Sequence, residues 1–418
     1  MTNSSVFDSL AGHKNVSTTL FDAALKSRTL LSSRATERAR ARTAGEAPHM
    51  IHESGFPQSW LFTGPPGSGR SNAAVAFAAA LVCTSPDTVG CGQCEGCRTA
   101  LNGNHQDIKH IKPQALSIGV DYTRNIIEAA STKPVASNWR VVIFENADRL
   151  SASAANALLK TVEEPPESTV IILLAPSTDP QDIAITLRSR CRHLYIPTPS
   201  VIDIARILVS EGASQADAEL AAAASSNHIG RARYLVKDQK AQTRRASILN
   251  LSELIFHGDT AFRAVNTLVK LIETSATDDL KAKEEQEVDA LRLSHGAGAR
   301  GKGMQKAVRG MDGEVKELEK QQKLRRTRML RDSLDLALID LAGIYRDALM
   351  ISSHASVGLT HPDMVGLSRE LASKVSAQGL LECLDAISTC RESLGFNVRP
   401  IVAMDALVGR LRKAYKVS

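Results

Sequence analysis

Residues 64–71 constrain the fold of this chain more than any other segment, because they read Gly-Pro-Pro-Gly-Ser-Gly-Arg-Ser. The pattern G-x-x-x-x-G-K-[ST] binds nucleotide phosphates: glycines let backbone N–H groups surround a phosphate, a lysine reaches its oxygens, and a hydroxyl holds Mg²⁺. The glycines and the hydroxyl are present as Gly64, Gly67, Gly69 and Ser71. Arg70 stands in the place of the lysine. A planar, forked guanidinium does not fit the place of a compact ammonium without rearrangement.

The residues on either side of this segment favour a true phosphate-binding loop over a glycine-rich turn. Residues 59–63 form a short apolar and aromatic run that is typical of a buried strand, and residues 72–82 are rich in alanine without a helix breaker. Strand, glycine loop and helix follow in the order that a phosphate-binding loop requires.

Further strands and helices alternate after the loop, which indicates an α/β fold with a parallel sheet covered on both faces. The predicted strands are residues 107–111, 139–144 and 169–174, and the predicted helices are residues 120–130 and 152–162. Beyond residue 199 the pattern is helical, with three short helices over 202–235 and longer ones to the end. Residues 33–58 show no clear periodicity and are predicted to form a long surface loop.

The end of the predicted strand 139–144 should carry the second motif of an ATPase. In active enzymes an apolar strand ends in Asp-Glu, where the aspartate organises Mg²⁺ and the glutamate activates the attacking water. This chain has Glu145 and Asn146 instead. Glu145 is one methylene too long for the Mg²⁺ position, and Asn146 cannot accept a proton from water. We therefore expect no ATP hydrolysis, whereas the glycines and Ser71 leave ATP binding open.

Four of the seven cysteines lie close together, as Cys83, Cys91, Cys94 and Cys97. In a reducing compartment such a cluster predicts a metal site before it predicts disulfides. Four thiolates would close the tetrahedral shell of Zn²⁺ and leave no position for a substrate, so we predict a structural zinc module over residues 83–97. An iron–sulfur cluster and free thiols are the alternatives.

Charge and hydropathy exclude little by themselves. The net charge of +6 is small for 418 residues and indicates only tolerance of a nucleic-acid neighbour. The N-terminus lacks a basic region followed by an apolar stretch, and no run of eighteen apolar residues occurs. We expect a cytoplasmic protein with reduced cysteines and no membrane partner.

Several segments in order resemble the bacterial clamp-loader branch of the AAA+ superfamily. They are Val-Phe-Asp-x-Leu-x-Gly at 6–12, the altered phosphate loop, the four cysteines, Ala-Asn-Ala-Leu-Leu-Lys-Thr-Val-Glu-Glu-Pro-Pro at 155–166 and Arg-Ser-Arg-Cys at 188–191. The resemblance is strong over residues 1–235 and weak beyond them. Within that branch, the altered motifs are similar to a subunit that does not hydrolyse ATP rather than to the active gamma/tau type.

The resemblance implies a three-part organisation. Residues 1–199 would form an AAA+ P-loop domain with the inserted zinc module, residues 200–240 a small helical lid, and residues 241–418 an all-α collar that oligomerises. A flexible, charged and glycine-rich insertion is predicted at about 278–313 within the collar.

The resemblance also implies functional residues. Arg190 matches an arginine finger that reaches the ATP of a neighbouring subunit and stabilises charge on the transferring phosphoryl group. Arg233 matches the second sensor of the family, and Ser177 lies near the first. Gamma/tau and delta clamp-loader subunits, the sliding clamp and, through the assembled hetero-oligomer, primed DNA would be the partners.

The implied function is that of a stator in the DNA polymerase III holoenzyme, which supports ATP-dependent loading of the clamp during DNA replication. One alternative is an active motor, such as a gamma/tau-type ATPase or a branch-migration helicase, against which Arg70 and Asn146 argue. The other is a zinc-dependent DNA-binding module, which predicts tight, salt-sensitive DNA binding by the isolated chain.

Overall fold

The computed structural model describes residues 5–10, 14–47, 55–113, 117–294, 304–396 and 398–417. The chain divides into two compact units. The first comprises residues 1–113, 117–218 and 227–232, and the second comprises residues 114–116, 219–226 and 233–418. The predicted domain boundaries at 199 and 240 stay a prediction, and Gly12 of the 6–12 motif lies outside the described residues.

A parallel sheet of five strands forms the centre of the first unit, in the order β2-β3-β4-β1-β5. Its strands are β1 (Ser59–Thr63), β2 (Ile108–Ile111), β3 (Arg140–Phe144), β4 (Thr169–Ala175) and β5 (Arg192–Tyr195). This confirms the α/β class and the four strands that the apolar runs predicted. The carboxyl ends of parallel strands meet at one edge, so the loops after β1, β3 and β4 lie beside one another.

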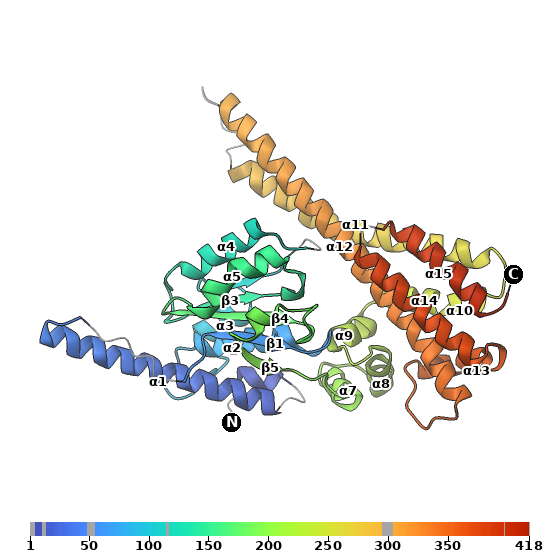
Figure 1. Cartoon of the computed structure of the whole chain (residues 1–418), viewed down its shortest axis with the longest axis horizontal. Coiled ribbons are helices and arrows are strands. Elements are labelled where there is room, and N and C mark those ends of the chain that lie inside the picture. The colour runs from blue at the N-terminus through green and yellow to red at the C-terminus, as the bar shows by residue number, and fades with distance from the viewer. Residues whose placement is uncertain are drawn as a thin grey trace. The chain divides into compact units, whose positions relative to one another are not determined.

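Helices cover both faces of this sheet because successive strand side chains point to opposite sides. Trp60 and Phe62 pack into a core with α1 and α2, whereas Leu61 packs into a second core with α4 and α5. Figure 1 shows these layers on either side of the strands. The helices are α1 (Lys14–Ala44), α2 (Arg70–Leu81), α3 (Glu95–Leu101), α4 (Val120–Ser131), α5 (Ala152–Glu163) and α6 (Ile185–Arg188); short 3₁₀ turns lie at η1 (Val6–Ser9) and η2 (Ala147–Arg149).

Local chemistry sets the ends of the helices that carry candidate site residues. Helix α2 begins at Arg70, directly after Gly69, whose φ of 89° is a left-handed conformation that favours glycine. Helix α5 begins after Ser151, whose side chain accepts a hydrogen bond from the N–H of Ala154. It ends at Glu163 because the residue before a proline is pushed out of the helical conformation, and two prolines follow at 165 and 166.

Two features of the first unit differ from the sequence-based expectation. The prediction of a loop over 33–58 is wrong for residues 33–44, which continue α1; residues 48–54 lie outside the described residues. This stretch contains good helix formers such as alanine and arginine and no glycine or proline before Gly45, so helix propensity prevails. Strand β5 was not predicted, because as an outer strand it carries exposed polar side chains instead of an apolar run.

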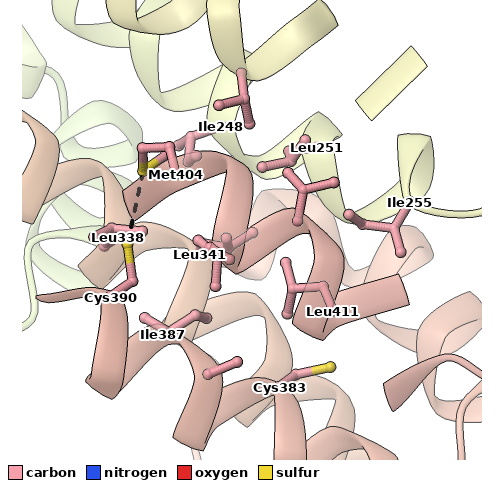
Figure 2. Packing of buried hydrophobic residues seen from close by; sticks show 14 of the residues in the cluster. Ile248, Leu251, Ile255, Leu338, Leu341, Cys383, Ile387, Cys390, Met404 and Leu411 are labelled. Atoms are coloured by element: carbon pink, nitrogen blue, oxygen red, sulfur yellow. Dashed lines mark hydrogen bonds between the residues drawn. The ribbon is translucent and has the colours of Figure 1, made fainter. Parts of the chain in front are cut away.

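Helical segments follow the sheet, and those from residue 239 onward contribute to one apolar core. The three short helices predicted over 202–235 are present as α7 (Val201–Ser210), α8 (Gln215–Ala224) and α9 (Ile229–Lys237). After them come α10 (Gln239–Leu254), α11 (Thr260–Ser294), α12 (Met304–Ser352), η3 (Pro362–Met364), α13 (Val365–Lys374), α14 (Ala377–Gly395) and α15 (Pro400–Ala414). Figure 2 shows Leu341 of α12, Ile387 of α14 and Leu411 of α15 in that core.

The prediction of a flexible insertion at about 278–313 is wrong for residues 278–294 and 304–313, which are helical in α11 and α12. Residues 295–303 lie outside the described residues. The two helices are joined by ion pairs: Arg325 contacts Glu287 at 2.8 Å and Glu284 at 3.4 Å. Charge density indicated a solvated segment, but here opposite charges on two facing helices pair with each other.

Candidate functional site

The phosphate-type loop between β1 and α2 is built on glycines that other residues approach closely. A side chain at Gly64 would place its Cβ 2.1 Å from the carbonyl oxygen of Ile196, and Gly67 has a φ of 86°. A Cβ at Gly67 would lie 2.4 Å from Cγ of His228. No other residue type fits these two positions, because each contact is shorter than a van der Waals distance. The loop is therefore closely packed, and at Gly67 it packs against the residue that precedes α9.

His228 is a site residue that the sequence reasoning missed. Its ring nitrogen Nδ1 accepts a hydrogen bond of 3.2 Å from the N–H of Arg231, in the first turn of α9. Burial lowers the pKa of His228 below its ordinary value, and the charges of Arg231 and Arg70 lower it further. A neutral imidazole thus lies on the phosphate loop. A glycine at 67 is the only signal in the sequence, and it does not reveal its partner.

Arg70 is half-buried among carboxylates of its own chain. Burial lowers its pKa, and the negative charges of Asp148, Glu145 and Asp182 act in the opposite direction. Burial raises the pKa of Asp148. Carboxylates of the same unit thus act on the charge of this guanidinium without outweighing its burial.

Glu145, at the position that would organise Mg²⁺ in an ATPase, interacts with other residues of its own chain. His110 Nε2 lies 2.7 Å from Glu145 Oε1. Burial by itself would raise the pKa of the Glu145 carboxyl, but the hydrogen bond and positive charge of His110, the charge of Lys112 and a hydrogen bond from Ser71 together hold this pKa below its ordinary value. Asn146 has a left-handed φ of 56°, which asparagine tolerates, and directly precedes η2. No general base stands at the position after Glu145.

The two candidate sensor residues have different surroundings. The hydroxyl of Ser177, after β4, donates to Asp182 at 2.6 Å and accepts from the N–H of Asp179 at 2.9 Å. Arg233 lies on α9 in the second unit, so its place beside the phosphate loop stays a prediction.

The four clustered cysteines converge, and all their Sγ atoms lie within 4.8 Å of one another. Cys83 follows α2, and Cys94 caps α3 by accepting from the N–H of Cys97. Its Sγ lies 3.8 Å from that of Cys83, which also lies 3.8 Å from the Sγ of Cys91. Four zinc–sulfur bonds of about 2.3 Å in a tetrahedron place sulfurs about 3.8 Å apart, whereas a disulfide requires about 2.05 Å. The donor set and its spacing fit a closed zinc site.

Arg190 lies in the turn after α6, near the end of α5. Its Nε donates to Glu163 Oε2 at 2.8 Å, and its Nη1 donates to the carbonyl oxygen of Thr186 at 3.0 Å. The side chain is 35% exposed. Cys191 packs against the core, and burial raises the pKa of its thiol to about 12, so it remains a neutral packing residue.

Comparisons with known proteins place these features in a family context. Residues 42–200 match the family model described as DNA polymerase III, delta subunit. The delta' subunit of Yersinia pestis DNA polymerase III is 30% identical over 257 residues, which cover 56% of this chain and 69% of that protein. The delta' subunit of Bacillus subtilis (strain 168) is 29% identical over 207 residues, or 50% of this chain and 62% of that protein.

The tau subunit of Bacillus subtilis (strain 168) is 39% identical over 139 residues, which are 33% of this chain and 24% of that protein. The chain thus spans less than two thirds of both Bacillus subtilis relatives. Among solved structures, a gamma subunit-related protein of Thermotoga maritima shares 17% identity, with a TM-score of 0.40 over 85% of this chain and 94% of that one. None of the helices in the described part of the chain is long and apolar enough to cross a membrane.

Proposed function

The chain belongs to the delta' family of bacterial DNA polymerase III clamp-loader subunits, and we propose that it is the stator of such a loader. In this role it does not hydrolyse ATP, and it supports ATP-dependent loading of the sliding clamp onto primed DNA. It would assemble with gamma/tau and delta subunits as part of the polymerase holoenzyme. The three-part division into P-loop domain, lid and collar belongs to the same proposal.

One observation supports the proposal that this chain does not hydrolyse ATP. Glu145 is bonded to His110 and Ser71, and the next residue, Asn146, provides no base for a water molecule. General-base activation of water requires a proton acceptor within hydrogen-bond reach, and an amide cannot serve. The replacement of lysine by Arg70 acts in the same direction, because it removes the compact charge that reaches the terminal phosphate.

The same proposal gives Arg190 a catalytic role in a neighbouring subunit. An arginine finger is a guanidinium that stabilises negative charge on the phosphoryl group as it is transferred. Arg190 fits this role because it is exposed, whereas Arg70 is half-buried and carboxylates of its own chain act on its charge. The chain would then contribute to catalysis in the adjacent site and not in its own.

Two measurements test this function. Purified chain alone should release no phosphate from ATP above background, and the Ser71→Ala variant should behave identically. In a complex reconstituted with gamma/tau and delta subunits, Arg190→Ala should assemble normally and lower ATP turnover at the adjacent site about 10-fold or more. Phosphate release by the isolated chain that is lost in Ser71→Ala would instead support the alternative hypothesis of an active gamma/tau-type ATPase.

We further propose that Cys83, Cys91, Cys94 and Cys97 hold a structural zinc ion. The spacing of their sulfurs supports this, and the ion would supply cross-links between the end of α2 and the start of α3. Metal analysis should find about one zinc per chain, and Cys94→Ser should lose it together with stability of the first unit. Strong salt-sensitive DNA binding that disappears with the metal would favour the DNA-binding module instead.

A further inference from the structure

The turn that carries Arg190 is fixed to the core on both sides. Leu187 is fully buried in the cluster formed by α4, α5 and the sheet, and Cys191 packs against the same cluster. Val162, next to Glu163, is buried in it too. Both backbone segments are therefore anchored on one rigid core, and the ion pair between Arg190 and Glu163 joins their outer ends.

The hydrogen bonds of Arg190 occupy one part of its guanidinium. Nε donates to Glu163 at 2.8 Å, and Nη1 donates to the carbonyl oxygen of Thr186 at 3.0 Å and approaches Ser189 Oγ at 3.5 Å. Among the residues that the structure describes, Nη2 has no hydrogen-bond partner. The side chain is 35% exposed, which leaves part of it open to an acceptor from outside the chain.

We propose that Glu163 is the positioning residue of Arg190: it holds the guanidinium through Nε so that Nη2 is presented to a phosphoryl oxygen of nucleotide bound in the neighbouring subunit. This proposal rests on the finger role of Arg190. A long arginine side chain otherwise samples many rotamers, and a donor fixed before the reaction stabilises the transition state without reorganisation. The carboxylate acts through Arg190 and does not itself contact the nucleotide.

This role differs from a contribution to folding. Ion pairs between exposed groups contribute little to stability, and Glu163 is 55% exposed in its side chain. Removal of the Glu163 carboxylate should therefore leave the free energy of unfolding of the chain unchanged, and should lower ATP turnover. The neighbouring Glu164 is also exposed, and no contact joins it to Arg190, so Glu164→Ala is a matched control.

The test uses the reconstituted complex with Glu163→Ala, Glu163→Gln, Glu164→Ala, Arg190→Ala and the double variant Glu163→Ala with Arg190→Ala. We expect Glu163→Ala to lower kcat about 3- to 10-fold with little change in KM for ATP, because the finger acts in the transition state. Glu163→Gln retains an oxygen acceptor for Nε and should recover at least about half of the lost rate. Glu164→Ala should match the wild type.

The double variant separates the two proposals. If Glu163 acts through Arg190, then Glu163→Ala adds no further loss once Arg190 is alanine. An Arg190→Ala complex with unchanged turnover would refute the finger role, and the positioning role with it. A strong Arg190→Ala defect with normal Glu163→Ala turnover, or an additive loss in the double variant, would refute the positioning role alone.

Discussion

Two arginines of the first unit, Arg70 and Arg190, stand in contrasting surroundings. Arg70 is half-buried, and three carboxylates of its own chain act on its charge. Arg190 is exposed, and its contacts with Glu163 and Thr186 leave Nη2 without a partner among the described residues. The same type of side chain is half-buried under the influence of its own chain's carboxylates in one place and exposed in the other. The contrast teaches that the position of a nucleotide-loop motif does not by itself show which arginine of a chain is accessible to a ligand.

The largest effect should come from the packing of the phosphate loop. Gly67→Ala must adopt a left-handed φ of 86° and place a Cβ 2.4 Å from His228, so we expect a loss of about 3 kcal/mol in the free energy of unfolding. Gly69→Ala has a similar φ of 89° but open space around it, and should lose only about 1 kcal/mol. Urea denaturation of both variants measures the difference. Equal losses would show that His228 does not pack on the loop.

A second prediction compares the arginines directly. Arg70→Met removes a positive charge on which three half-buried carboxylates act, and should cost about 1–2 kcal/mol of stability. Arg190→Met removes an exposed ion pair and should cost about 0.5 kcal/mol or less. The same denaturation experiment, carried out on purified chain, compares the two. If Arg190→Met were the more destabilising change, Arg190 would be a structural residue and the comparison would be reversed.

A smaller effect should appear in the pH dependence of stability. Burial, with the charges of Arg231 and Arg70, lowers the pKa of His228 below the ordinary 6.5. Below pH 6.5 the unfolded chain therefore binds a proton that the folded chain does not, and stability is lost as the pH falls towards the lowered folded value. His228→Asn should show a shallower loss between pH 7 and pH 5 than the wild type. Parallel stability curves for the two proteins would contradict a buried, neutral His228.

Much of the fold follows from local patterns, and the exceptions have physical causes. Apolar runs identified β1, β3 and β4 because these strands are buried on both faces. Strand β5 could not be predicted in this way, because it lies at the edge of the sheet, pairs with one strand only and has mostly exposed side chains. The charged residues 278–294 predict a flexible insertion, because a charged sequence does not reveal that another helix supplies its counter-charges.

The candidate site shows the same division. The glycines, the cysteine cluster and Arg190 are visible in the sequence because each belongs to a short motif. The contacts of Gly67 with His228 and of Arg190 with Glu163 are not, because they join segments that only the folded chain brings together. Spacing in the sequence identifies the type of group at a site, whereas its partners depend on the tertiary structure.

The smallest effect is expected for the double variant Arg70→Lys with Asn146→Glu, which tests whether ATP hydrolysis can be restored. These substitutions restore two of the three altered motif positions and leave Glu145 in place, and we expect no phosphate release by the isolated chain. Glu145, whose side chain is one methylene longer than the aspartate that organises Mg²⁺, would still bond to His110. His228 would also still pack on Gly67. Ser71→Ala in the double variant is the control. ATP turnover that depends on Ser71 would show that these two substitutions alone separate this loop from an active site. The difference in surroundings between Arg70 and Arg190 would then not explain why the chain lacks hydrolysis.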